Sequence, residues 1–138
     1  MRAFLDTNVL LDSIIERENR QFSEDADLIL KLGKNGTLDL CMSILSLPTI
    51  AYVVKNVTVA GKKAIIKTLT SYIEVLPALP EHVNEMLDSP LNDIEDALQL
   101  LSAKSGGCDI IITRNVADFH QSDIPAITPE QLLNRILE

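Results

Sequence analysis

Residues 93–115 read DIEDALQLLSAKSGGCDIIITRN, and this stretch decides the fold. Apolar residues recur at helical spacing over residues 93–104, and the pair Gly106-Gly107 ends the pattern. Residues 109–112 then form a run that is too apolar for a half-exposed strand. A helix that leads into a fully buried strand is typical of an α/β protein with a parallel sheet.

The same alternation continues in both directions from this stretch. Acids in its first turn predict a second helix that opens at Ser23 and ends at Gly33 and Gly36. Another helix is expected from Ser43, where Pro48 is tolerated only in a first turn or at a kink. Apolar runs and helical spacing predict further strands at 3–5, 38–42, 72–76 and 124–127, and further helices at 7–15, 62–70, 81–87 and 129–137. We therefore predict one α/β domain over residues 1–138, with a parallel sheet covered by helices on both faces.

The composition restricts the function. The chain carries 20 acidic and 12 basic residues, which gives a net charge of −8. An indiscriminate nucleic-acid binder needs a positive field, so this charge argues against one. Only 4% of the residues are aromatic, which leaves few side chains on which bases could stack. The charge is compatible with an enzyme that gathers carboxylates in one pocket to hold a cation.

Several common kinds of site and location are not supported. Cys41 and Cys108 lie in apolar runs without a CxxC partner, which predicts buried thiols in a reducing compartment. His82 and His120 lack the spacing of zinc ligands. No apolar stretch approaches the ~20 residues that span a bilayer, and the apolar start of the chain stops at Asp6, unlike a signal peptide. We expect a soluble, cytoplasmic protein with no membrane contact.

Acidic and polar residues follow the predicted strands. Asp6 comes directly after the first strand, and Thr113, Asn115 and Asp118 follow the strand at 109–112. In an open parallel sheet, ligands bind outside the carboxyl ends of the strands. Acids that converge there repel one another unless a proton or a divalent cation shares the site, and Mg²⁺ prefers oxygen ligands. Carboxylates without a histidine, thiol or serine nucleophile point to metal-assisted hydrolysis, most commonly of phosphodiesters.

The helix at 93–104 adds two more acids. Asp96 shares a strip with Leu100 and Ala103, so it interrupts an apolar surface as a ligand would. The core side is predicted to comprise Ile94, Ala97, Leu98 and Leu101, widened by Leu100 and Ala103. The polar side is predicted to comprise Glu95, Gln99 and Ser102, with Glu95 in solvent. Each acid also has a structural interpretation, since Asp6 or Asp93 could cap a helix, Asp96 could favour a helix start, and Asp118 could form a turn.

Two motifs resemble those of a known family. Residues 4–12, FLDTNVLLD, resemble the opening motif of the PIN-domain ribonucleases, the family of the VapC-type toxins. Residues 95–97, EDA, followed by Ala103 and by residues 109–119, DIIITRNVADF, resemble the closing motif of that family. The order, the spacing and the length all agree, so the resemblance covers essentially the whole chain.

The resemblance implies a three-layer α/β/α fold around a central parallel sheet of about four to five strands. It also implies an acidic pocket that binds Mg²⁺ or Mn²⁺ and cleaves RNA endonucleolytically through a metal-activated water. Carried over to this chain, the resemblance makes Asp6, Asp96 and Asp118 the catalytic metal-site carboxylates, with Asn115 at the fourth position in branches that place an acid there. Supporting polar groups would be Thr7, Asn8, Thr113 and Asn115.

The chain departs from the family at the second carboxylate. The family usually places a Glu in the helix after the second strand, and counting from Ser43 places Thr49 at that position. Residues 42–56 contain no acid at all. Either Asp93 compensates as a metal ligand, or the metal is held more weakly through water, or the activity is altered or lost.

The partners implied are an RNA substrate and a cognate antitoxin protein, and a homodimer is expected. Lys62, Lys63 and Lys67, together with Arg114, could contact RNA, or they could be solvated surface charges. The apolar run at 44–54 is either core or an interface for a second copy or the antitoxin. Two other functions stay open: a catalytically weak or inactive PIN module that binds RNA or a protein, and an unrelated α/β phosphohydrolase acting through Asp6. The latter needs an Asp-x-Asp loop, and Asn8 occupies its second position.

Overall fold

The computed structural model describes residues 1–15 and 17–137. In this part of the chain the elements follow in the order β1 (Arg2–Leu5), α1 (Thr7–Ile14), α2 (Arg20–Lys34), β2 (Asp39–Ser43), α3 (Ser46–Val53), α4 (Val59–Thr70), β3 (Ile73–Leu76), α5 (His82–Leu87), α6 (Ile94–Ser105), β4 (Ile110–Ile112), the 3₁₀ helix η1 (Val116–Phe119), β5 (Ala126–Ile127) and α7 (Pro129–Leu137). Helices thus connect successive strands, as the sequence predicted.

The strands form one parallel sheet in the order β3-β2-β1-β4-β5. β1 lies at the centre, with Phe4 opposite Cys41 of β2 on one side and opposite Ile111 of β4 on the other. These residues are fully buried, as a strand covered on both faces requires. The predicted parallel sheet of four to five strands is confirmed.

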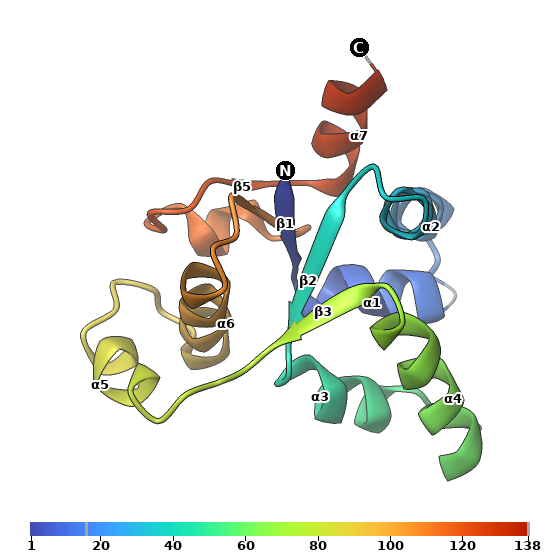
Figure 1. Ribbon diagram of the computed structural model, residues 1–138, viewed down its shortest axis with the longest axis horizontal. Coiled ribbons are helices and arrows are strands. Elements are labelled where there is room, and N and C mark those ends of the chain that lie inside the picture. Colours follow the sequence, from blue (N-terminus) through green and yellow to red (C-terminus); the bar gives the residue numbers. More distant parts are fainter. Residues whose placement is uncertain (16, 138) are drawn as a thin grey trace.

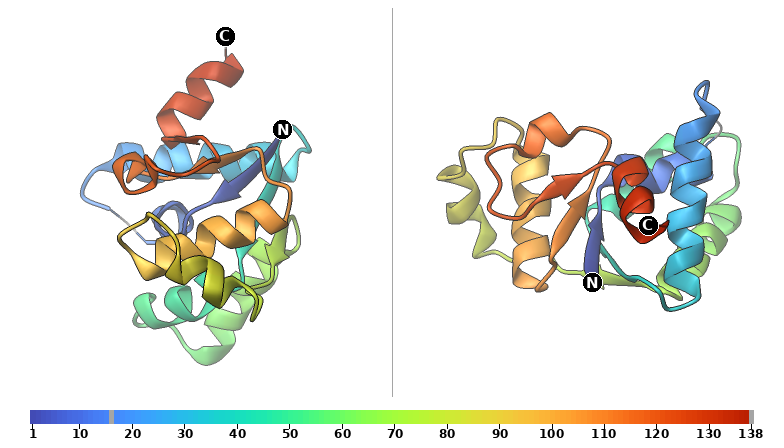
Figure 2. Two further views of the ribbon diagram at one scale, coloured as in Figure 1. Left: turned by 90° about the vertical axis from the view of Figure 1, so that its left-hand side faces the viewer. Right: turned by 90° about the horizontal axis from the view of Figure 1, so that it is seen from above.

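Helices cover both faces of this sheet (Figures 1 and 2). Figure 1 shows α1, α2 and α4 on one side and α5 and α6 on the other. Alternate residues of β1 belong to two separate hydrophobic cores, because successive side chains of a strand point to opposite faces of the sheet. Ala3 and Leu5 join the core under α1 and α2, whereas Phe4 joins the core under α6 with Leu100 and Phe119. The fold is therefore a three-layer α/β/α arrangement, as expected.

Helix α2 differs from its prediction at both ends. It begins at Arg20 instead of Ser23, because the side chain of Asn19 accepts a hydrogen bond from the Gln21 N–H at 3.0 Å and caps the helix. Gly33 lies inside the helix instead of ending it. A Cβ at Gly33 would stand 2.3 Å from Leu40 Cδ1, so the close approach of α2 to β2 requires glycine. Gly36, with φ +83°, forms the turn that follows.

Helix α6 buries Ala97, Leu100 and Ala103 as predicted, but its buried face also includes two residues that were expected on the polar side. Gln99 and Ser102, expected on a polar side, are 1% and 0% exposed, whereas Ile94, expected in the core, is 64% exposed. Ser102 is satisfied by donating from Oγ to the Pro77 carbonyl at 3.1 Å. The prediction was wrong because a polar side chain with a partner at a strand end can be buried, which helical periodicity does not reveal.

The expectations for Pro48 and for the burial of the two cysteines are confirmed. Pro48 lies in the first turn of α3, where its missing N–H costs no helical bond. Cys41 and Cys108 are buried, free thiols. No helix in the described residues combines the length and the apolar character that crossing a bilayer requires.

Candidate functional site

The acidic residues gather where β1 and β4 end side by side. β2 pairs with one edge of β1, and β4 pairs with the other edge. The order of the strands therefore reverses between β1 and β4, which makes their carboxyl ends a topological switch point. Asp6 follows β1 directly, and its N–H donates to the Ile112 carbonyl of β4 at 3.0 Å. Asp6 and Thr113 are 5% and 0% exposed, so the carboxylate that follows β1 is held inside the protein.

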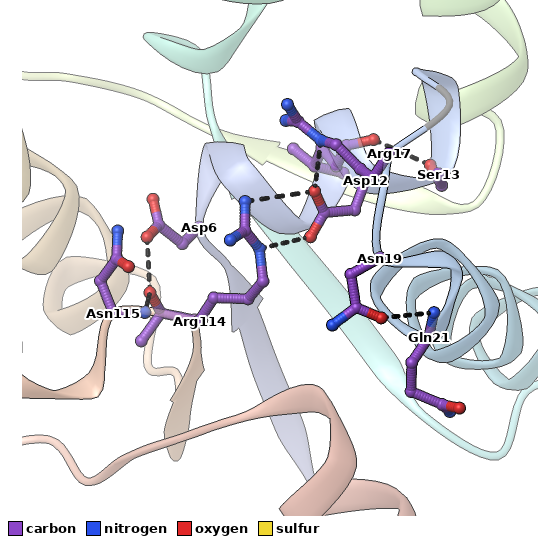
Figure 3. Close-up of polar contacts among 10 residues, drawn as sticks. Asp6, Asp12, Ser13, Arg17, Asn19, Gln21, Arg114 and Asn115 are labelled. Atoms are coloured by element: carbon purple, nitrogen blue, oxygen red, sulfur yellow. Dashed lines mark hydrogen bonds and ion pairs between the residues drawn. The ribbon is translucent and has the colours of Figure 1, made fainter.

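Thr113 is the direct partner of the buried carboxylate. Its Oγ1–H donates to Asp6 Oδ2 at 2.7 Å, and the same hydroxyl accepts from the Asn115 N–H at 3.0 Å (Figure 3). Burial raises the pKa of Asp6 above its ordinary value, while the hydrogen bonds from Thr113 and from the Thr7 N–H oppose the rise. A further positive charge or hydrogen-bond donor beside Asp6 would therefore stabilise its ionised form.

Helix α6 and η1 bring further acids to the same place. Burial raises the pKa of Asp96 to about 7, and the charges of Asp93, Asp6 and Asp118 contribute to the rise. The charge of Asp118 also contributes to the raised pKa of Asp6. Asp96 thus lies near enough to Asp93, Asp6 and Asp118 to be repelled by each of them. Such a cluster is fully ionised only at a cost, unless a cation or protons neutralise it.

A cavity of about 150 Å³ opens between the start of α6 and η1. Its acidic lining residues are Asp93, Asp96 and Asp118, and His120 also lines it. The oxygen donors suit a hard cation such as Mg²⁺, which keeps several of its waters. Over residues 1–15 and 17–137, no three acidic, histidine or cysteine side chains meet closely enough to enclose an ion as they stand. The donor chemistry fits a divalent cation, and water or side-chain movement would have to complete its coordination.

Thr7 and Asn8, two of the predicted supporting residues, follow Asp6 in the first turn of α1. Thr7 Oγ1 and Ser46 Oγ of α3 are 2.7 Å apart, and both residues are buried. Asn8 Oδ1 is buried without a hydrogen-bond partner among the described residues. A buried oxygen of this kind can accept a hydrogen bond or ligate a cation.

Helix α3 brings no carboxylate to this site. The Thr49 hydroxyl donates within its own helix, to the Leu45 carbonyl at 3.5 Å. Ser46 is the α3 residue that reaches the site, through Thr7. Sequence reasoning missed Ser46; the only signal was a second serine shortly after Ser43.

Gln99 is the second residue that sequence reasoning missed. Its Nε2 donates to Glu95 Oε1 at 3.4 Å, and hydrogen bonding from Gln99 lowers the pKa of Asp6. Glu95 is exposed, as expected, but burial raises its pKa and the charges of Asp93 and Asp6 add to the rise. The available signal was an amide between apolar residues, one helical turn after Asp96.

Arg114 is held next to the site by Asp12. Asp12 is 1% exposed and accepts from Arg114 Nε at 2.6 Å and from Arg17 Nε at 2.8 Å (Figure 3). The Arg114 guanidinium also lies 4.5 Å from the centre of the Phe22 ring. A positive charge is thereby fixed beside the carboxyl end of β4. No local pattern predicts a pair so far apart in sequence.

The structure does not bring the predicted lysines to the acids. Lys62 Nζ donates to the Ala51 carbonyl at 2.6 Å, and Lys63 and Lys67 are exposed on α4. That helix belongs to the layer opposite α6 (Figure 1). The apolar run at 44–54 is divided, since Ile50 and Val54 are buried whereas Ile44 and Tyr52 are exposed.

The sequence matches known proteins over its length. The family model described as the PIN domain matches residues 2–117. The protein described as ribonuclease VapC1 of Aquifex aeolicus (strain VF5) is 31% identical over 140 aligned positions, covering 97% of this chain and 94% of that protein. The family match removes the unrelated α/β phosphohydrolase from consideration.

Solved structures agree in fold. A toxin–antitoxin complex from Klebsiella pneumoniae matches with a TM-score of 0.67 at 20% identity, covering 92% of this chain and 97% of the other. VapBC-1 from nontypeable Haemophilus influenzae matches with a TM-score of 0.65 at 21% identity, covering 94% and 99%. VapBC2 from Rickettsia felis, bound to a promoter DNA fragment, matches with a TM-score of 0.62 at 15% identity, covering 93% and 98%. With its motifs, its fold and its acidic cluster at the switch point, this chain belongs to the PIN domain family.

Proposed function

We propose that this protein is a divalent-metal-dependent endoribonuclease and the toxin of a toxin–antitoxin pair. The observation that carries the proposal is the cluster of Asp6, Asp96 and Asp118 at the switch point, in which burial and mutual repulsion raise the pKa of Asp96 to about 7. A protein that keeps mutually repelling carboxylates at one point has a use for a cation there.

Asp6, Asp96 and Asp118 would hold Mg²⁺ or Mn²⁺, with Asp93 as a further oxygen donor. A cation held there would supply an activated water and would neutralise the charge that develops on the phosphodiester. The protein contributes orientation: Thr113 fixes one oxygen of Asp6 at 2.7 Å, and Asp93 fixes the first turn of α6 by accepting from the Asp96 N–H at 2.9 Å. Arg114, fixed by Asp12, is a charge that an RNA phosphate could approach.

Relatives support the substrate and the partner. The relative described as ribonuclease VapC1 is 31% identical, which supports RNA as the substrate. The VapBC and toxin–antitoxin complexes of the same fold support a cognate antitoxin as the partner. We extend the proposal to a cytoplasmic homodimer, for which the exposed apolar side chains Ile44, Tyr52 and Val59 offer contact surface.

Cleavage of a mixed cellular RNA pool by the purified protein tests this function. We expect cuts with Mn²⁺, none with chelator, and none with Asp6→Asn. Asp27→Asn is the matched control, because Asp27 is an exposed acid on α2, away from the cluster, and it should cut like the parent.

A catalytically silent PIN module is the second function that the chain supports. The observation in its favour is that Thr49 stands where the family usually has an acid and bonds within its own helix. Absence of both RNA cleavage and Mn²⁺ binding would favour this module over the nuclease.

A further inference from the structure

Gln99 is an unusual residue for the buried face of a helix. Its side chain is 1% exposed, and its Oε1 has no hydrogen-bond partner among the described residues. Its Nε2 donates to Glu95 Oε1 at 3.4 Å, and the same amide also lowers the pKa of Asp6. A buried amide with an unpartnered oxygen is costly to the fold, so its position between two carboxylates calls for a functional reason.

Glu95 and Gln99 lie on one side of α6, and Asp96 lies on another. Ser102, on the same strip as Glu95 and Gln99, donates to the Pro77 carbonyl just after β3, so this strip faces the half of the sheet that contains β2 and β3. Asp96 instead lines the cavity beside η1, together with Asp118. The two strips of α6 therefore face different neighbours: one faces the chain just after β3, and the other faces the cavity beside η1.

The connection that follows β2, on the side of the sheet that this strip faces, carries no acid, although Asp39 and Glu74 lie within β2 and β3 themselves. Helix α3 follows β2, and residues 42–56 contain no Asp or Glu. Among the described residues, α3 contributes the Ser46 hydroxyl, which lies 2.7 Å from Thr7 Oγ1. The other acids of the proposed site, Asp93, Asp96 and Asp118, all line the cavity beside η1.

We propose that Glu95, positioned by the amide of Gln99, is the carboxylate that completes the metal site on the side where α3 provides none. This inference rests on the proposed function. The Gln99 amide group offsets the repulsion between Glu95 and Asp6 by donating to carboxylates that would otherwise repel each other. Its unpartnered Oε1 remains as a neutral oxygen at the same point.

Mn²⁺ titration calorimetry on the full chain tests the inference with Glu95→Gln and Gln99→Met. Methionine keeps the unbranched shape of glutamine and removes its polar atoms. We expect each variant to lower the Mn²⁺ affinity by about tenfold, the effect typical of groups that orient metal ligands. Glu81→Gln, an exposed acid before α5, should bind as the parent does.

Thermal unfolding without metal separates positioning from a structural role. Gln99→Met should unfold at the same or a higher temperature than the parent, because it removes a buried amide with an unpartnered oxygen. Weaker Mn²⁺ binding together with undiminished stability would support the inference. Mn²⁺ affinity equal to that of the parent in both variants would overturn it.

Asp6→Asn separates this inference from the function on which it rests. If the parent binds Mn²⁺ and Asp6→Asn does not, while Glu95→Gln and Gln99→Met bind normally, the nuclease site stands and the role of Glu95 is refuted. If the parent itself binds no Mn²⁺, the inference and the proposed function fail together.

Discussion

Asp6 is the residue on which the candidate site depends, and Thr113 is what keeps it in place. The carboxylate is 5% exposed and receives a 2.7 Å hydrogen bond from the Thr113 hydroxyl. A buried carboxylate without such a donor would favour its protonated form. The strand that ends at Ile112 therefore contributes a donor as well as apolar packing.

Replacing this donor tests the pair. We expect Thr113→Val to lower the free energy of unfolding by about 1–3 kcal/mol at pH 7, because it leaves a buried carboxylate oxygen without its partner. Urea unfolding measures the change. Thr68→Val is the control, since the Thr68 hydroxyl bonds only within the exposed surface of α4; an equal loss in both variants would argue against a special role for Thr113.

Asp96 makes the free energy of unfolding depend on pH, and its raised pKa determines the direction of that dependence. Its pKa is raised from 3.8 to about 7 in the folded protein, so the folded state binds the proton more tightly than the unfolded chain does. The resulting stabilisation is complete below pH 4 and is lost as the pH rises through about 7. Repulsion in the acidic cluster then destabilises the metal-free protein.

Asp96→Asn should remove this dependence. In chelator at pH 8 we expect its melting temperature to exceed that of the parent by about 2 °C, a modest effect because the side chain is partly solvated. At pH 4 the two proteins should melt together. Thermal scans at both pH values measure this, and a parent that is more stable than Asp96→Asn at pH 8 would refute the repulsion.

Among the elements, α6 combines a structural and a chemical function at its first turn. Asp93 caps the helix by accepting from the Asp96 N–H at 2.9 Å, and it also lines the acidic cavity. Both interpretations made from the sequence are therefore compatible with its position. Only substitution can separate them.

Asp93→Asn and Asp93→Ala form a matched pair for this purpose. Asparagine caps a helix as well as aspartate does, so Asp93→Asn should unfold like the parent, whereas Asp93→Ala should lose about 1 kcal/mol. If Asp93 is also a ligand, both should bind Mn²⁺ more weakly in calorimetry. Parent-like Mn²⁺ affinity in Asp93→Asn would restrict Asp93 to capping.

An element could be predicted from the sequence where neighbouring residues alone determine it. The α6–β4 unit could be predicted because its apolar spacing and its Gly106-Gly107 stop are local signals. The start of α2 could not be predicted from acids alone, because a cap at Asn19 begins the helix earlier. The burial of Gln99 was missed because periodicity treats every amide as a solvent-facing group, whereas this one has acidic neighbours.

On the scale of the whole molecule, the sequence predicted which polar residues follow strands, and the strand order brings them together. Asp6 and Thr113 meet because β1 and β4 are neighbours. The pair of Asp12 with Arg114 also depends on that neighbourhood, and no local pattern indicates it. Long-range ion pairs are products of the topology, so a single sequence reveals the positions of the acids better than it reveals their partners.

The net charge of −8 and the acidic cluster predict that a divalent cation stabilises the whole domain. At a concentration of Mn²⁺ that is 100 times its dissociation constant, binding to the folded state adds about 2.7 kcal/mol. Thermal scans at pH 7.5 should show the melting temperature rising with Mn²⁺ for the parent and not for Asp6→Asn. An equal rise in both proteins would mean that Mn²⁺ acts outside the site.

Anomalous diffraction from crystals soaked in Mn²⁺ tests the central claim most directly, because it locates the ion without depending on activity. The proposed site predicts one strong peak between the end of β1 and the first turn of α6, in contact with the carboxylates of Asp6 and Asp96. A strong peak elsewhere on the molecule, with no density at that position, would contradict a metal-dependent nuclease site built on these acids.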